Sequence, residues 1–104
     1  MILNEVREAA RKRILFLPHA IAQMSRLSRM ISAEEIRSVI MEGKIIEDYP
    51  NDIRGHSCLM KGYGNNGRAI HIVCAPKEEY LAIITAYLPT DDLWSGNFTI
   101  RRIK

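Results

Sequence analysis

Apolar residues are densest between positions 57 and 87, where they form three short runs separated by polar turns. The runs cover residues 57–63, 68–75 and 80–87 and contain many of the branched and aromatic residues that favour strands. Asn65 and Asn66 lie between two glycines, which suits a two-residue hairpin turn whose central positions need positive φ. The pattern predicts three consecutive antiparallel strands, and the rest of the chain is organised around them.

Side chains alternate between two faces along a strand, so the turn decides which residues share a face. With Asn65 and Asn66 as the loop, one face is expected to carry Cys58, Met60, Gly62, Ala69, His71 and Val73. The other face is expected to carry Leu59, Lys61, Tyr63, Arg68, Ile70, Ile72 and Cys74. If Tyr80 lies opposite Cys74, the His71 face also receives Leu81, Ile83, Thr85 and Tyr87. Cys58 and Cys74 then point to opposite faces, which predicts two reduced core cysteines and no disulfide.

Helical periodicity precedes these strands. Residues 4–13 suit a first helix because Leu3, Val6 and Ala10 recur at helical spacing, and its last turn is basic. A second helix is predicted from Pro18 onward, with a buried stripe that contains Ala20, Met24, Leu27 and Ile31. A second stripe on that helix contains His19, Gln23 and Arg26, with Arg29 one turn further. Such a row can bind phosphate, or it can simply be a solvated polar face.

The third predicted helix has both of its ends specified by local sequence. Ser32 and Glu35 form a capping box, and Gly43 is placed to end the helix. Shorter strands are expected at residues 14–17 and 44–49, and a turn with one helical turn capped by Thr90 is expected after Tyr87. Together these elements predict an α+β fold, in which two or three N-terminal helices pack on one face of a three- to five-stranded antiparallel sheet.

With 104 residues the chain is expected to form a single domain, residues 1–104. The formal net charge is +3, and the excess lies in residues 1–44, which hold eight Lys or Arg against five Asp or Glu. An anionic partner for that segment is therefore consistent with the charge distribution. The sequence shows neither a signal-peptide pattern nor an apolar run long enough to span a bilayer, so a cytoplasmic protein with no membrane partner is expected.

No familiar catalytic signature or phosphate-binding loop is present. The residue types that bind zinc do occur, but His19, His56, His71, Cys58 and Cys74 lack the spacing of a zinc site apart from His56 and Cys58. We therefore expect no metal and no cofactor.

The remaining polar residues suit metal-independent cleavage of RNA. That reaction needs a base near the 2′-hydroxyl, an acid for the leaving 5′-oxygen and cations near the phosphate. His71 and His56 are the candidate catalytic residues. The candidate substrate-binding residues are His19, Arg26, Arg29, Arg54, Arg68, Tyr87 and Trp94, with Tyr63 as a further stacking residue. The competing interpretation of His71 is a hydrogen-bonded core histidine.

Several motifs in order resemble the bacterial domain-of-unknown-function 4258 family. They are H-A at 19–20, R-M-I-S-A-E-E-I at 29–36, G-K-I-I-E-D-Y-P at 43–50, H-S-C-L at 56–59, G-R-A-I-H-I-V-C-A at 67–75, A-I-I-T-A-Y-L-P at 82–89, and Trp94. The resemblance covers about residues 14–102 and leaves residues 1–13 as an N-terminal helical extension. This chain departs from the family in that extension and in two extra residues between His19 and Arg29.

The resemblance implies a fold similar to the RelE-type ribonuclease toxins and a partner that is a small antitoxin with a zinc-finger or helix-turn-helix domain. It carries over no catalytic residue, because the family has no established activity. The resulting hypothesis is a toxin-antitoxin-like protein that binds RNA and cleaves it by metal-independent acid-base chemistry. The alternative hypothesis is a non-enzymatic module that binds protein or RNA.

Overall fold

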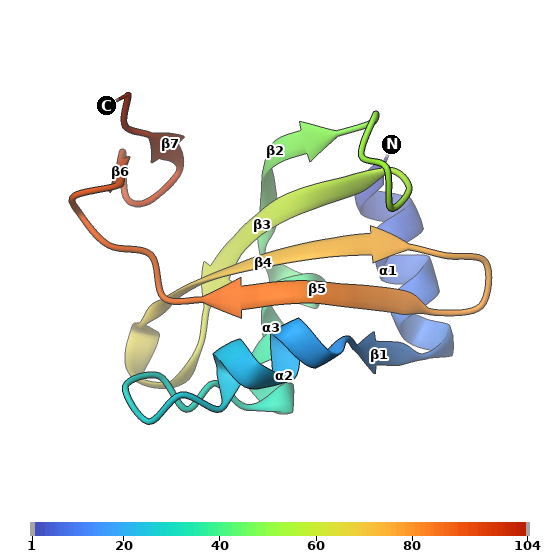
Figure 1. Cartoon of the computed structure of the whole chain (residues 1–104), viewed down its shortest axis with the longest axis horizontal. Coiled ribbons are helices and arrows are strands. Elements are labelled where there is room, and N and C mark those ends of the chain that lie inside the picture. Colours follow the sequence, from blue (N-terminus) through green and yellow to red (C-terminus); the bar gives the residue numbers. More distant parts are fainter. Residues whose placement is uncertain (1, 104) are drawn as a thin grey trace.

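A computed structural model describes residues 2–103 of the chain (Figure 1). Within that range the helices are α1 (Ile2–Lys12), α2 (Pro18–Met24) and α3 (Ala33–Glu42), with a 3₁₀ turn at Asn65–Gly67. The strands are β1 (Ile14–Phe16), β2 (Lys44–Tyr49), β3 (Ser57–Tyr63), β4 (Ala69–Pro76), β5 (Leu81–Tyr87), β6 (Trp94–Ser95) and β7 (Ile100–Arg101). The helices and strands predicted from periodicity are therefore present, and the structure confirms the α+β class.

Five strands form one sheet in the order β1-β5-β4-β3-β2. The sheet is mixed, because β1 pairs with β5 in parallel, so the expectation of a purely antiparallel sheet is wrong. The short apolar run Ile14–Phe16 returns from α1 along the free edge of β5 and satisfies its backbone groups. Leu81 N donates to Arg13 O at 2.8 Å, and Leu17 N donates to Ile83 O at 3.1 Å, which anchors both ends of the added strand.

All three helices pack on one face of the sheet, called here the inner face; the opposite face is the outer face. The core beneath the helices joins α1 and α3 to alternate residues of the central strands, among them Val6, Ala10, Ile36, Ile40, Cys58, Met60, Ile70, Ile72, Cys74, Leu81 and Ile83. A second link between α1 and α3 is polar. Arg7 donates from Nε to Ile40 O and from its terminal nitrogen to Gly43 O, both at 2.9 Å. These bonds satisfy carbonyl groups that the end of α3 leaves unpaired.

Helix α3 begins and ends as predicted. The Ser32 hydroxyl accepts a hydrogen bond from Glu35 N, and the Glu35 carboxylate accepts one from Ser32 N at 3.0 Å. Gly43 follows the last helical residue, and its amide donates to Val39 O. Each of these contacts joins residues three or four positions apart, which explains why the sequence pattern was sufficient.

Helix α2 is shorter than its apolar stripe predicts. It ends at Met24, and the chain reverses in a tight turn in which Met30 has a φ of 49°. Ile31 reaches the core through that turn, because its amide donates to Met24 O at 3.0 Å, whereas Leu27 is 91% exposed. The predicted burial of Leu27 is therefore wrong, and Arg26 does not continue a helical row with His19.

The β3–β4 hairpin has a three-residue loop instead of the predicted two-residue loop. Gly64 N donates to Arg68 O at 2.8 Å, and positive φ falls on Asn66 and Gly67. Tyr63 therefore pairs with Ala69, which shifts the register by one residue. Met60 and Ile72 now share the inner face, while Leu59, Lys61 and His71 share the outer face.

The shift also corrects the expectation for the cysteines. Cys58 lies directly opposite Cys74, and their sulfur atoms are 3.9 Å apart on the inner face. Both are free thiols, and both are fully buried. Cys74 is also where β5 departs from regular alternation, because the ladder skips Ile84. Cys74 therefore lies opposite Ile83 and not Tyr80, and the expectation that Leu81 and Ile83 share the face of His71 is wrong, since both lie on the inner face. Tyr87 stays with His71 as predicted.

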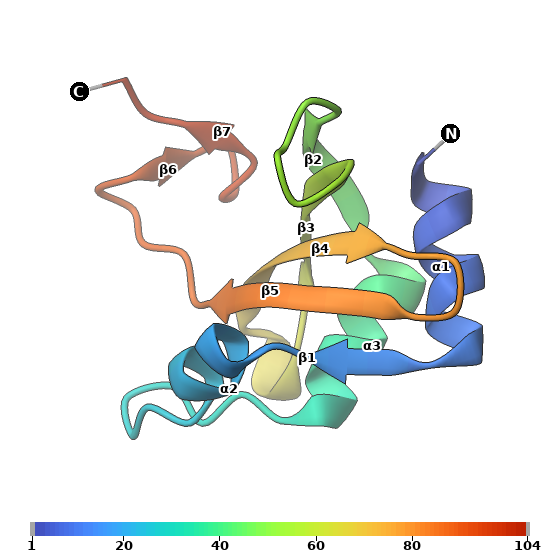
Figure 2. The same ribbon diagram turned by 45° about the vertical axis from the view of Figure 1, so that its right-hand side comes forward.

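Strands β6 and β7 form a separate two-stranded unit, called here the C-terminal hairpin, residues 94–101. Figure 2 shows this hairpin on the side of the sheet opposite α1. It extends from the end of β5 through turns at residues 91–93, where Leu93 N and Trp94 N donate to Thr90 O. The hairpin covers part of the outer face, which the helices leave free.

Candidate functional site

Three polar residues form a row across the central strands of the outer face. Lys61 of β3 lies directly opposite His71 of β4, and His71 lies directly opposite Tyr87 of β5. Side chains at directly opposed positions are close neighbours on one face. The row therefore brings together an ammonium, an imidazole and a phenol.

His71 is fully buried, and both of its ring nitrogens have partners. Nε2 donates to the carbonyl oxygen of Phe98 at 2.7 Å, since a carbonyl can only accept. Nδ1 lies 3.1 Å from the Tyr87 hydroxyl and, in the neutral ring, accepts from it. Burial lowers the pKa of His71, although the hydrogen bond to Phe98 opposes this effect. The imidazole is therefore held neutral, in one tautomer.

The C-terminal hairpin is the cover over His71. The Trp94 ring meets the imidazole edge-on, with centroids 4.5 Å apart, and is itself only 2% exposed. Arg101 stacks over the Trp94 ring, with its guanidinium carbon 4.7 Å from the centre of that ring. Tyr87 lies beside His71 on the predicted common face, and Trp94 also contacts the ring, but the hairpin separates the imidazole from solvent.

The turn of the hairpin has an unusual backbone. Gly96, Asn97 and Phe98 have φ values of 59°, 58° and 65° in succession. Left-handed backbone is costly for a bulky residue such as Phe98 and persists only where contacts enforce it. Two hydrogen bonds provide these contacts here. The Phe98 carbonyl accepts one from His71, and the Asn97 side chain donates one to Tyr63. The strained turn places both groups against the outer face.

Tyr63, two residues after Lys61, extends the polar row to the end of β3. The Lys61 ammonium donates to the Tyr63 hydroxyl and also lies 3.9 Å from the centre of its ring. Asn97 donates to the same hydroxyl from Nδ2 at 2.7 Å. The Lys61 hydrogen bond, and after it the Asn97 bond, lowers the pKa of Tyr63. Lys61 is 4% exposed and Tyr63 is 50% exposed, so the row reaches solvent through the phenol.

At the other end of the C-terminal hairpin, a carboxylate forms an ion pair with Arg101. Glu47 of β2 accepts two hydrogen bonds from Arg101, at 2.9 and 3.2 Å, and one from the Tyr49 hydroxyl. Arg101 lowers the pKa of Glu47, and burial together with Glu47 raises the pKa of Tyr49 to about 12. These bonds tie β7 to β2 and fix the hairpin over the sheet.

His56 does not join His71. His56 lies in the loop before β3, where its Nε2 is 2.5 Å from Oδ1 of Asp48 on β2, and its ring is partly exposed. Four strand positions separate Ser57 from Lys61, the partner of His71, which corresponds to about 13 Å at the usual rise. Arg54 lies in the same loop and is bound to Asp52 through two hydrogen bonds at 2.9 and 3.1 Å. The two histidines therefore occupy separate places.

Arg68 holds the loop of the β3–β4 hairpin against the start of α3. Its guanidinium donates to both oxygens of the buried Glu35 carboxylate, at 2.9 and 3.0 Å. It also donates to the carbonyls of Arg29 and Met30. The bond to Arg68 is the main reason that the pKa of Glu35 falls to about 2, with further contributions from amide donors. Arg68 thus makes four intramolecular hydrogen bonds to three residues.

The other predicted binding residues gather around α2. His19 and Arg26 are exposed, and Arg29 donates to Gln23 Oε1 at 2.6 Å. They lie on the helix side of the protein, whereas His71, Tyr87 and Trp94 lie on the outer face. The residues around α2 therefore lie apart from the His71 cluster, as do His56 and Arg54 in the loop before β3.

Sequence reasoning missed four members of the outer-face cluster: Lys61, Asn97, Arg101 and Glu47. A lysine within the apolar run of residues 57–63 was the one available signal, since an ammonium in such a strand must find a polar partner. Asn97, Arg101 and Glu47 carry no local signature. Their contacts span 34 to 54 positions along the chain.

Over residues 2–103 there is no group of three or more His, Cys, Asp or Glu arranged to hold a metal ion. The same range contains no helix of sufficient length and apolarity to cross a membrane.

The comparison with known families matches residues 16–88 to the domain of unknown function DUF4258. The chain belongs to this family. No curated protein and no solved structure matches the chain. The DUF4258 match contains Lys61, Tyr63, His71 and Tyr87, whereas α1 and the C-terminal hairpin lie outside it. The matched span is thus shorter than the residues 14–102 expected from the motifs, and Trp94 falls beyond it.

Proposed function

We propose that this DUF4258 protein binds RNA and cleaves it without a metal ion, in the manner of a toxin-antitoxin ribonuclease. The observation that carries the proposal is the Lys61–His71–Tyr87 row, which places a cation, a neutral imidazole and a phenol at adjacent positions on the sheet face that the helices leave free. The likeness to RelE-type toxins is part of this proposal. It is supported by the α+β architecture with helices on one face of the sheet.

The proposed reaction uses the RNA's own 2′-hydroxyl. The 2′-oxygen attacks the adjacent phosphorus, and the bond from phosphorus to the 5′-oxygen breaks. A base removes the 2′ proton and an acid supplies one to the leaving 5′-oxygen, so the products are a 2′,3′-cyclic phosphate and a 5′-hydroxyl. Neutral His71 is the candidate base, and Lys61 is the candidate cation that stabilises the phosphate charge. His71 acts in this way only when the C-terminal hairpin moves off its ring.

The cleavage test uses the full chain and end-labelled single-stranded RNA in the presence of a chelator. His71→Gln is expected to lower the rate by about 10²- to 10⁴-fold, the usual contribution of acid-base catalysis. His56→Gln is the matched control, since the structure places that ring apart from the row, and it is expected to cleave at the wild-type rate. An RNA with a 2′-deoxy sugar at the cleaved position should resist cleavage. Equal background cleavage by wild type and His71→Gln contradicts the proposal.

One observation favours the alternative, a non-enzymatic RNA-binding module. His71 is fully buried, and both ring nitrogens are already bonded within the chain. Binding without cleavage, with an affinity that falls steeply as salt rises, would support this alternative, because phosphate contacts release counterions. Binding that is indifferent to salt contradicts RNA recognition in either form.

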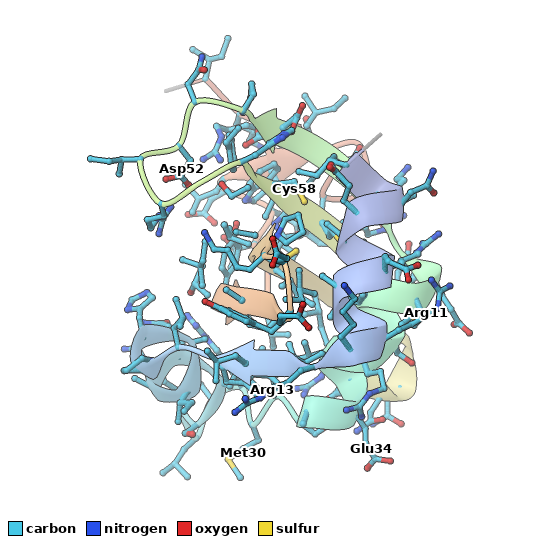
Figure 3. The ribbon with its side chains drawn as sticks, turned by 90° about the vertical axis from the view of Figure 1, so that its right-hand side faces the viewer. Arg11, Arg13, Met30, Glu34, Asp52 and Cys58 are labelled. Atoms are coloured by element: carbon cyan, nitrogen blue, oxygen red, sulfur yellow. The ribbon has the colours of Figure 1, made fainter. Side chains whose placement is uncertain are left out.

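The proposed partner is a small antitoxin with a zinc-finger or helix-turn-helix domain. The surface of α2 and its following turn suits an acidic amphipathic segment, since Ile21, Leu27 and Met30 are 52%, 91% and 61% exposed beside the exposed Arg26. Met30 projects away from the body of the protein (Figure 3). Co-expression with the product of a neighbouring short reading frame tests this. Retained binding by a Leu27→Glu, Met30→Glu variant would contradict this surface as the contact.

A further inference from the structure

A pocket of about 330 Å³ opens where the polar row reaches solvent. It lies between the end of α3, the start of β2 and the end of β3, and its lining includes Glu42, Lys44, Lys61, Tyr63 and Asn97. Small-ligand sites begin at about this volume. The pocket therefore has room for one small polar ligand.

The Tyr63 hydroxyl is incompletely satisfied by the chain. A phenol oxygen has two acceptor positions and one proton to donate. Lys61 and Asn97 occupy the acceptor positions. Among residues 2–103, no oxygen or nitrogen accepts the hydroxyl proton within hydrogen-bond distance. The phenol proton is thus free to bond to solvent or to a ligand at the wall of the pocket.

The positive charge at this wall also lacks a counterion. Lys61 is 4% exposed, and within the described part of the chain no carboxylate lies within 4.0 Å of its ammonium. Lys44 lies directly opposite Lys61 across the β2–β3 ladder and also lines the pocket. A buried cation without a counterion is costly, so an anionic oxygen that enters here would offset that cost.

Glu42 adds a different requirement. Its carboxylate belongs to the last turn of α3 and lines the same pocket, so it repels a simple anion. The ligand must combine an anionic group for the lysine side with N–H donors for the carboxylate. A nucleotide does both, because it joins a phosphate to a base edge with N–H groups, and the guanine edge offers adjacent ones.

We propose that this pocket binds one nucleotide, with its phosphate on Lys61, Tyr63 and Asn97 and its base edge toward Glu42. The proposal rests on the proposed RNA binding and assigns to it a recognition site at the end of β3. The half-exposed Tyr63 also supplies an aromatic edge beside the ligand. The site is open to solvent, so a nucleotide enters it without displacement of the C-terminal hairpin.

The test is a titration of the full chain with guanosine 5′-monophosphate, followed by amide chemical shifts in NMR spectra. We expect saturable shifts at Gly43, Gly62 and Asn97, and binding at least tenfold weaker for inorganic phosphate and for guanosine, since each makes half of the contacts. Tyr63→Phe and Asn97→Ala should each weaken binding by about tenfold, as loss of a hydrogen bond to a charged group does. Glu42→Gln should tighten the binding of inorganic phosphate.

Arg13→Ala is the matched control, because it removes one exposed positive charge between α1 and β1, outside the pocket lining, and should leave nucleotide affinity unchanged. Lys61→Met should abolish binding; if it fails to fold, Tyr63→Phe and Asn97→Ala decide the result. Absence of saturable shifts, equal affinity for phosphate and nucleotide, or wild-type affinity in both variants overturns the proposal. This readout needs no cleavage. If the protein cleaves RNA but no nucleotide binds in the pocket, only the proposed nucleotide site is wrong. If a nucleotide binds there but RNA is not cleaved, only the proposed catalysis is wrong.

Discussion

The ring of Trp94 stands at 90° to the ring of His71, with their centroids 4.5 Å apart. This contact joins a hairpin outside the DUF4258 match to a residue within it. The imidazole is therefore covered by a segment of the chain that the family match does not include.

Removal of the Arg101 side chain should loosen this cover. Arg101 stacks on Trp94 and bonds Glu47, so Arg101→Ala should shift the emission of Trp94, the one tryptophan in the sequence, to longer wavelength and increase its quenching by acrylamide. Stability should fall by no more than about 1 kcal/mol, since the Arg101 side chain of this ion pair is 59% exposed. Arg11→Ala, which removes an exposed ion pair with Glu8, is the control. Unchanged quenching would show that Arg101 does not hold the hairpin.

His71 should make stability depend on pH near neutrality. Burial lowers its pKa below the ordinary 6.5, so the unfolded chain binds a proton more readily than the folded one. The contribution of neutral His71 to folding stability is complete above pH 6.5, and it is lost as pH falls toward the lower pKa of the folded state. The nearby charges are Lys61 and Arg101, which reinforce the shift, and Glu47, which opposes it.

The measurement is the urea midpoint from pH 7.5 to 5. The wild-type midpoint should decrease on acidification, and His71→Gln should flatten this dependence. His19→Gln changes an exposed histidine and should retain the wild-type slope. An identical slope in His71→Gln and wild type would remove His71 as the cause.

A second pH dependence should appear in acid from Glu35. Its pKa falls from 4.5 to about 2, chiefly through Arg68, so the carboxylate stabilises the fold above pH 4.5 and this effect is lost as pH falls toward 2. The difference corresponds to roughly 3 kcal/mol. Glu35→Gln should destabilise the protein at pH 7 and reduce its acid sensitivity. Glu34→Gln, one residue earlier in the same helical turn but exposed, should do neither.

Tyr63 should ionise before the other perturbed tyrosines. Lys61 and Asn97 lower its pKa, whereas burial raises the pKa of Tyr49 and Tyr87. Absorbance at 295 nm should therefore show Tyr63 titrating below pH 10, ahead of Tyr49 and Tyr87. Tyr63→Phe should remove that step, Asn97→Ala should move it upward, and Tyr80→Phe should leave it in place. Persistence of the step in Tyr63→Phe would assign it to another tyrosine.

The sequence by itself determined the elements whose contacts are local. Helix α3 was predictable at both ends, because Ser32, Glu35 and Gly43 act within three or four positions of their partners. The strand extents followed from runs of branched and aromatic residues bounded by turn residues. The α+β class with helices on one face followed in turn, as did the common face of His71 and Tyr87.

The tertiary structure alone decided the register, the cover over His71 and the composition of the site. One additional loop residue between Tyr63 and Ala69 moved Leu59 to the outer face and brought Cys58 opposite Cys74, because strand alternation has a period of two. The Phe98 bond to His71 and the Asn97 bond to Tyr63 span 27 and 34 positions. Such contacts form only when segments far apart in the sequence meet in the folded chain, and no local sequence pattern specifies which segments meet.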